Sequence, residues 1–171
     1  MIVETEPLYD SFALYGSGVT LVSVRDADQH RFFIAGSVLT ASVAPFTLAV
    51  SVGEDRDALP AIRRGEPWAL TVLGEHHAPL VRALTSRSTM RSERLAALAD
   101  AGAEASAEGP LWLPDGLVTF WCRVRDAVPV NDQVLLTGDV GRGSLPGDST
   151  PLLRWKHAFR GARDLEQRGD A

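Results

Sequence analysis

Residues 34–45, IAGSVLTASVAP, place small and hydroxyl-bearing side chains between two apolar runs, RFFIA and FTLAVSV. Each apolar run has the composition of a β-strand. Gly36 and Ser37 are small enough to let another group come close to the backbone. The stretch is therefore either a corner of a sheet, where glycine also recurs, or a backbone segment that approaches a ligand. Taken alone, the residues favour the corner.

Five other side chains could carry chemistry. His76 and His77 are adjacent, so they point to different faces of the chain, and no carboxylate or further histidine stands at ligand spacing. A solvated loop is favoured over a metal site. Trp155 and His157 alternate on an expected strand; sheet packing is favoured, and stacking over a flat heterocycle is the alternative. Cys122 lies within LVTFWCRV and is expected to be a buried hydrophobe rather than a reactive thiol.

Several common active-site motifs are missing from the sequence. The glycines of GDVGRGSLPG follow an expected strand and open no helix, which argues against a dinucleotide-binding fingerprint. There is no Gly-x-Ser-x-Gly and no Walker lysine. The single cysteine excludes an intramolecular disulfide and a thiolate metal cluster. No metal is expected.

Length and charge limit the class of protein. We expect one domain over residues 1–171, with an ordered core of about residues 8–160 and a polar C-terminal tail, since no linker or repeat is visible. A net charge of −5 without a basic tail argues against a nucleic-acid partner and gives no support for a membrane partner. No apolar run approaches the ~20 residues that span a bilayer, and the acidic N-terminus lacks the order of a signal peptide. We expect a cytoplasmic protein.

The periodicity of apolar residues predicts many strands and few helices. Strands are expected at 19–24 and 30–35 as a hairpin, at 46–52 and 68–73, at 116–130 and 133–142 as a long hairpin across Asn131 and Asp132, and at 152–159. Helices are expected at 8–14, 57–65, 78–84 and 92–101. Residues 101–110 are small and polar, and we expect them to form a mobile connection. Without a regular βαβ alternation, this order predicts a mainly β protein, a β-barrel with inserted helices.

From about residue 12 to residue 159, the order of these segments resembles the flavin reductase-like family, whose fold is an FMN-binding split β-barrel of Greek-key type. The matching pieces are SGVTLVSV, IAGSVLTASVAPFTLAVSV, ALPAIRRGEPWALTVL, LVRALTS, VTFWCRVRDAVPVNDQVLLTGDV and PLLRWKHAF. The resemblance implies a homodimer that binds FMN or FAD noncovalently and transfers a hydride from NADH or NADPH to it. It also implies a partner flavin-dependent monooxygenase that receives the reduced flavin.

The resemblance also assigns binding residues. It places one segment along the flavin edge, which favours the ligand interpretation of the opening stretch: Ala35, Gly36, Ser37, Val38, Leu39 and Thr40. Trp155 and His157 become possible stacking residues for the flavin or the nicotinamide. No catalytic residue is expected, because the cofactors carry the hydride chemistry.

This chain departs from the family pattern where the phosphate is held. The family's Ser-x-x-Thr falls on Asp55, Arg56, Asp57 and Ala58. We expect Arg56 to supply a charge-assisted phosphate contact in place of the hydroxyls, with Arg87 or Arg91 in reserve. Gln133 and Arg154 stand where the family often has histidine and tyrosine.

The leading hypothesis is an NAD(P)H-dependent flavin reductase. The alternative is a split-barrel protein that binds a flavin or another planar ligand without reductase activity.

Overall fold

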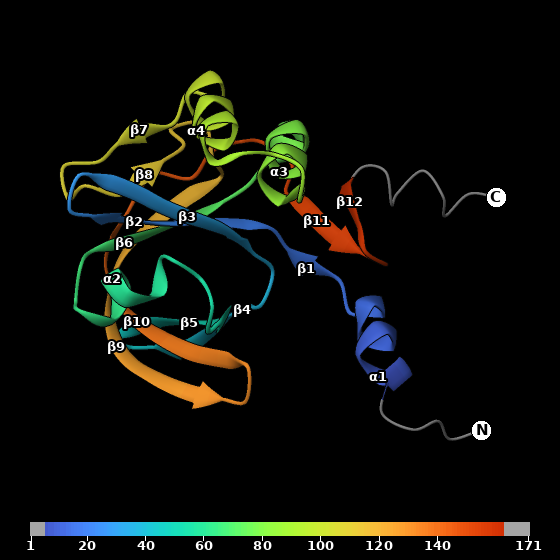
Figure 1. Ribbon diagram of the computed structural model, residues 1–171, viewed down its shortest axis with the longest axis horizontal. Helices are drawn as coiled ribbons and strands as arrows, with labels where there is room; N and C mark the ends of the chain where they lie inside the picture. The colour runs from blue at the N-terminus through green and yellow to red at the C-terminus, as the bar shows by residue number, and fades with distance from the viewer. Residues whose placement is uncertain (1–5, 163–171) are drawn as a thin grey trace.

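A seven-stranded antiparallel sheet forms the body of the protein in the computed structural model, which describes residues 6–162 (Figure 1). Across the sheet the strands are β3 (Gln29–Ala35), β2 (Thr20–Asp26), β6 (Trp68–Val72), β9 (Val118–Val130), β10 (Gln133–Gly143), β5 (Phe46–Gly53) and β4 (Val38–Val43). The two edge strands, β3 and β4, are consecutive in the chain. Only Gly36 and Ser37 join them, so the sheet curls until its edges meet at this corner.

Two small sheets and the helices surround this body. The small sheets are β1 (Ser17–Gly18) with β11 (Leu152–Trp155) and β12 (Ala158–Gly161), and β7 (Glu104–Ala105) with β8 (Leu111–Trp112). The α-helices are α1 (Glu6–Ser11), α2 (Leu59–Arg63), α3 (Ala78–Thr85) and α4 (Arg91–Asp100); the 3-10 helices are η1 (Phe12–Leu14) and η2 (Glu75–His77). In Figure 1, α1, β1 and the β11–β12 hairpin lie together on one side of the curled sheet.

The core has two parts because β2 is apolar on both faces. Val22 and Val24 belong to a cluster inside the curled sheet, which α2 completes with Leu59 and Ile62. A second cluster packs Val19 and Leu21 with apolar residues of α3, α4, β8 and β11. The alternation of apolar and hydroxyl residues in this segment predicts a half-buried strand, but Thr20 to Val24 are all buried. The hydroxyls of Thr20 and Ser23 donate to the Ala35 and Leu111 carbonyls, which allows their burial.

Most predicted elements are confirmed, including the mainly β class. The hairpin of β2 and β3 and the long hairpin of β9 and β10 form as expected. The helix expected at 57–65 is shorter, and Gly65 ends it with a φ of +94°, a conformation that glycine adopts without strain.

Three local predictions were wrong. The last strand is instead the tight β11–β12 hairpin, which turns at Lys156 and His157 with φ values of +49° and +60°. Residues 38–43 form the edge strand β4 rather than an irregular corner, because β5 offers them a pairing partner. The connection at 101–110 contains β7, which pairs with β8.

Among the residues that the structure describes, none of the helices combines the length and apolar character needed to cross a membrane. The single-domain assignment stays a prediction. The polar tail expected after Arg160 lies almost entirely outside the described residues.

Candidate functional site

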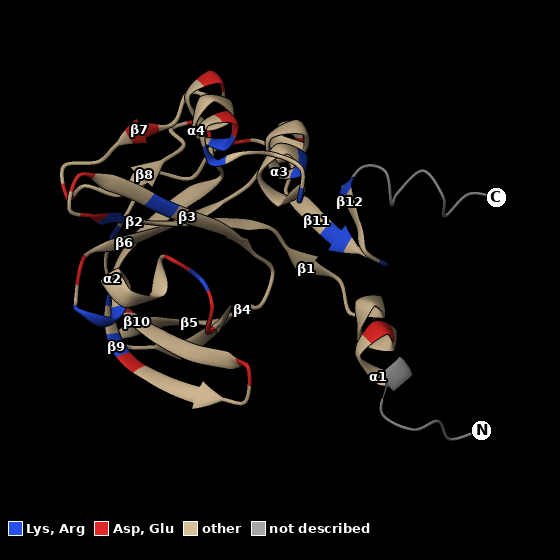
Figure 2. Ribbon diagram, viewed as in Figure 1, with Lys and Arg blue, Asp and Glu red and all other residues tan. Residues whose placement is uncertain are grey.

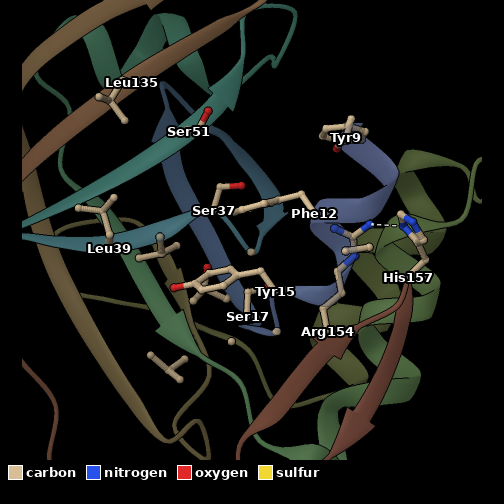
Figure 3. A pocket seen from close by; sticks show the side chains of 17 residues that line it. Tyr9, Phe12, Tyr15, Ser17, Ser37, Leu39, Ser51, Leu135, Arg154 and His157 are labelled. Carbon is tan, nitrogen blue, oxygen red and sulfur yellow. Dashed lines mark hydrogen bonds between the residues drawn. The ribbon is translucent and has the colours of Figure 1, made fainter. Parts of the chain in front are cut away.

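A groove of about 720 Å³ runs between the corner of the sheet and the N-terminal segment (Figure 3). Its volume lies within the roughly 300–1,000 Å³ of typical small-molecule sites. The residues that line it are Tyr9, Phe12, Ala13, Tyr15, Gly16, Ser17, Gly18, Thr20, Gly36, Ser37, Val38, Leu39, Ser51, Val72, Leu135, Arg154 and His157. Apolar, aromatic and small hydroxyl side chains dominate, and none of these described residues carries a carboxylate.

The corner between β3 and β4 forms one wall, so the opening stretch of the sequence is both a sheet corner and a wall of the groove. Two of its carbonyls already serve the fold: Ser51 N–H donates to the Ser37 carbonyl at 3.0 Å, and Thr20 Oγ1 donates to the Ala35 carbonyl at 2.8 Å. Of the six residues expected along a flavin edge, Gly36, Ser37, Val38 and Leu39 line the groove.

Ala35 and Thr40 do not line this groove. Ala35 is buried, with its side chain in the core. Thr40 is exposed but lies one residue after Leu39 on β4, and successive side chains of a strand point to opposite faces. Val38 and Thr40 share the other face of β4; Val38 lies next to the corner and lines the groove, whereas Thr40 lies farther along the strand and does not.

Aromatic side chains of the N-terminal segment form the facing wall. Tyr9, Phe12 and Tyr15 are exposed in the single chain, and the Phe12 and Tyr15 rings stack with centroids 5.2 Å apart. The sequence predicts only a helix at 8–14 here, with no binding role for its aromatic side chains. The spacing of three residues between these aromatic side chains was the available signal, because it places them on one side of a helix.

The β11–β12 hairpin closes the third side (Figure 3). Arg154 and His157 line the groove, with Arg154 Nη2 3.4 Å from His157 Nδ1. Trp155 does not line it. Its Nε1–H donates to the Leu14 carbonyl at 3.2 Å, and Lys156 Nζ lies 4.5 Å from its ring centroid. The expected alternation of Trp155 and His157 on one strand fails because the chain turns at Lys156 and His157.

A second hollow, of about 500 Å³, lies farther along the same pair of strands. Ser51 pairs with Leu135 at the groove, and two residues on, Gly53 pairs with Gln133 at the hollow. Glu54, Asp55, Asn131 and Asp132 complete its lining, so carboxylates surround it. Residues two apart on a strand share one face, so the hollow continues the line of the groove.

The loop after β5 holds the arginine expected to bind phosphate. Arg56 is exposed and pairs with no other side chain among the described residues. Asp57 does not compete for it, because Arg31 and Arg91 bind the Asp57 carboxylate at 3.0 Å and 3.2 Å. Arg91 already forms an ion pair with Asp57. Arg87 is exposed, and no ion pair involves it among the residues that the structure describes.

Ala58 needs a correction. It is fully buried in the core beneath α2, so its side chain reaches neither the groove nor the acidic hollow. The position equivalent to a phosphate-binding hydroxyl has become part of the apolar core.

The sequence pattern of the flavin reductase like domain matches residues 12–163 of this chain. The chain belongs to that family. The match includes every described residue of the groove except Tyr9.

Individual flavin reductases support the assignment. The chain is 30% identical over 151 residues to an NADH:riboflavin 5'-phosphate oxidoreductase of Streptomyces pristinaespiralis, covering 85% of this chain and 81% of the relative. It is 28% identical over 165 residues to an NADH-dependent FMN reductase of Streptomyces nodosus subsp. asukaensis, covering 94% and 88%. Its fold is similar to that of the styrene monooxygenase flavin reductase of Pseudomonas putida, with a TM-score of 0.76, 21% identity and coverage of 90% and 95%.

A histidine cluster lies outside the groove of this flavin reductase fold. His76 Nε2 and His77 Nε2 each lie 3.1 Å from one oxygen of Asp115. His77 is 3% exposed, so the expectation of a solvated loop was wrong for this residue. The sequence around His76 and His77 offers no carboxylate at ligand spacing, but the fold brings Asp115 to them from a loop 38 residues beyond His77.

The hydrogen bonds of His77 favour a structural role over a metal site. His77 connects the backbone at Gly74 to the side chain of Asp115, and we call this arrangement the histidine clip. Gly74 N–H donates to His77 Nδ1 at 3.1 Å, so Nδ1 carries no proton and Nε2–H donates to Asp115. A metal on Nε2 would leave a protonated Nδ1 facing the Gly74 N–H. Burial lowers the pKa of His77 below its usual 6.5, although the hydrogen bond to Asp115 opposes this.

Cys122 lies in the core and not at the groove. Burial, with a smaller contribution from Asp139, raises the pKa of its thiol to about 12. The thiolate that nucleophilic chemistry requires is therefore scarce at neutral pH. The structure agrees with the expected buried hydrophobe.

Proposed function

We propose that this protein is an NAD(P)H-dependent flavin reductase that reduces FMN or FAD. The groove beside the corner at Gly36 and Ser37 is the observation that carries the proposal. It has the volume of a ligand site, small residues on one wall and aromatic rings on the other. Two relatives that cover most of the chain are named as NADH-dependent reductases of FMN.

The groove fits a flat ring system with an extended, negatively charged tail. Leu39 and Leu135 offer apolar surface, and Gly36, Ser37 and Ser51 offer backbone and hydroxyl groups for the polar edge of a ring. A tail that runs along β5 and β10 toward Gly53 reaches the loop that carries Arg56. Arg56, with Arg87 as reserve, is our candidate for the phosphate.

A bound flavin supplies the hydride acceptor for a reduced nicotinamide. The protein therefore needs no proton-transfer residue at the groove. Its side chains bind the two ring systems, hold them face to face and exclude water, which is mainly a positioning effect. The absence of a carboxylate among the described lining residues is compatible with this task.

We also propose a homodimer. Leu39, Leu135 and Val128 lie on the outer face of the sheet and are 57%, 37% and 51% exposed in the single chain. Val128 pairs directly with Leu135, and Val130 follows two residues later on the same face. A group of exposed apolar side chains on one face is typical of a protein interface, and two groove residues, Leu39 and Leu135, belong to it.

The solved relative from Pseudomonas putida is named as the flavin reductase of styrene monooxygenase. By analogy, we propose that this protein supplies reduced flavin to a partner monooxygenase. A cytoplasmic location stays a prediction from the sequence.

One observation supports the alternative, a flavin-binding protein without reductase activity. The hollow next to the expected phosphate position is lined by Glu54, Asp55 and Asp132, whose charges repel a phosphate. If Arg56 did not offset this repulsion, the protein would bind FMN weakly or in another position.

Steady-state assays separate the two functions. The purified protein is mixed with FMN, FAD or riboflavin, and the oxidation of NADH and of NADPH is followed by absorbance. The reductase function predicts turnover with at least one pair. Measurable flavin binding without turnover by any pair would establish the alternative instead.

A further inference from the structure

The turn of the β11–β12 hairpin is strained. Lys156 and His157, its two central residues, both have positive φ. Two-residue hairpin turns of this kind favour asparagine and glycine, because other residues are strained there. Backbone strain tends to be retained at functional sites. This turn keeps two basic residues at positions where glycine would be more stable.

The hairpin is also basic within an acidic protein. Residues 149–162 include Arg154, Lys156 and Arg160 and no aspartate or glutamate, whereas the whole chain has a net charge of −5. Figure 2 shows this concentration of basic residues on β11, the turn and β12. The local charge suits an anionic ligand.

Two side chains of the hairpin, Arg154 and His157, are directed to the groove. Arg154 is the only lysine or arginine among the described residues that line it, and His157 lies beside it. The hairpin is held against the N-terminal segment, because Lys156 N–H donates to the Ala13 carbonyl at 3.0 Å. The position of Arg154 and His157 relative to the aromatic wall is therefore fixed.

We propose that Arg154 and His157 bind the phosphate groups of the nicotinamide dinucleotide. This inference rests on the proposed reductase function. The flavin phosphate is expected near Arg56, past Gly53 along β5, which leaves Arg154 for the second substrate. The planar guanidinium of Arg154 can bind a phosphate with two hydrogen bonds, and His157 can donate one from Nε2 when a phosphate replaces Asp10 there.

Residues of the N-terminal segment next to Arg154 and His157 also affect which ligand can bind. Asp10 Oδ1 lies 3.7 Å from His157 Nε2, so this carboxylate competes with an incoming phosphate. Tyr9 and Phe12 lie on the adjoining wall, where an adenine ring can stack on an aromatic side chain. The combination of a guanidinium, an imidazole and aromatic rings favours a nucleotide over a simple anion.

Binding of ADP-ribose to the FMN-loaded protein tests the proposal, because ADP-ribose carries both phosphates and no nicotinamide. We expect Arg154→Gln to weaken its dissociation constant roughly ten- to a hundredfold, the usual effect of losing a charge-assisted hydrogen bond. The KM for NADH should rise with little change in kcat. Asp10→Asn should strengthen ADP-ribose binding severalfold.

A matched pair of turn variants separates binding from folding. Lys156→Gly and His157→Gly each place glycine at a positive φ, so neither should lower the Tm. Lys156 lies over Trp155 and does not line the groove, so Lys156→Gly should change ADP-ribose affinity less than twofold. His157→Gly should weaken it severalfold at an unchanged or higher Tm.

Two outcomes would contradict the proposed phosphate site, and a third would contradict the reductase function alone. Unchanged ADP-ribose affinity in Arg154→Gln and His157→Gly, with normal FMN reduction, would show that the inference is wrong and the function right. A loss of FMN affinity in Arg154→Gln without a loss of riboflavin affinity would also overturn it, because Arg154 would then hold the flavin phosphate. If the unmutated protein oxidised no NADH, the proposed function would fail, while Arg154-dependent ADP-ribose binding would still support the phosphate site.

Discussion

Gly36 and Ser17 approach each other so closely that a Cβ atom on Gly36 would lie 3.0 Å from Ser17 Oγ. Gly36 does not have a positive φ, so backbone conformation does not explain the glycine. The crossing of β1 over the corner between β3 and β4 does. Both residues also line the groove, so the same glycine serves the fold and faces the proposed flavin.

These two roles of Gly36 can be separated with a double variant. Gly36→Ala forces Ser17 to move, which should cost about 1–3 kcal/mol of stability. Adding Ser17→Ala removes the close oxygen and should restore the Tm. We expect FMN affinity to stay at least tenfold weaker in the double variant, because the new methyl group lies against Ser17 and Gly18 and narrows the groove that these residues line.

The single variant Ser17→Ala is the control and should bind FMN almost normally. Tm is measured by thermal unfolding and affinity by quenching of flavin fluorescence. If the double variant recovers FMN affinity together with its Tm, Gly36 serves only the corner.

The phosphate contact makes a second prediction. Arg56→Ala should lower FMN affinity roughly ten- to a hundredfold while leaving riboflavin affinity unchanged, because a charge-assisted hydrogen bond contributes about 1.5–3 kcal/mol. Arg87→Ala is the comparison for the reserve position. Equal affinities of the unmutated protein for FMN and riboflavin would show that no phosphate anchor exists at either arginine.

The proposed dimer predicts a mass change on substitution of its apolar face. Val128→Glu places a charge between Leu135 and its neighbours on the outer face, so the protein should become monomeric in light scattering at micromolar concentration. Leu145→Glu changes an even more exposed leucine, at 90%, in the loop after β10 and should leave the dimer intact. A monomeric unmutated protein would contradict the dimer itself.

The histidine clip predicts a pH dependence of stability. Burial first, and the neighbouring His76, lower the pKa of His77 in the folded state, so the unfolded chain takes up the proton more readily. The contribution of His77 to stability is therefore complete above its usual pKa of 6.5 and is lost as the pH falls below that value.

His77→Gln tests the clip, since glutamine can accept from Gly74 N–H and donate to Asp115 in the same place. The fall in Tm between pH 7.5 and pH 5 should be smaller in this variant than in the unmutated protein. An identical fall in both would mean that other groups, such as His30, cause the acid sensitivity.

The sequence by itself determined the mainly β class, the two hairpins of β2–β3 and β9–β10, and the helices α3 and α4. These follow from the period of apolar residues and from turn residues a few positions away, which act locally. It also located four groove residues, Gly36 to Leu39, through their small side chains and the resemblance of the surrounding segments to a family. The β11–β12 turn was missed because lysine and histidine are not the residues that such a turn favours.

Only the tertiary structure decided which distant groups meet. His76 and Asp115 stand 39 residues apart, and Ser17 pairs with Arg154 across most of the chain. The aromatic wall exists because η1 is held to the β11–β12 hairpin by the bond from Trp155 to Leu14, 141 residues apart. Contacts of this range depend on how the curled sheet and its helices bury their apolar faces together, and no short window of sequence carries that information.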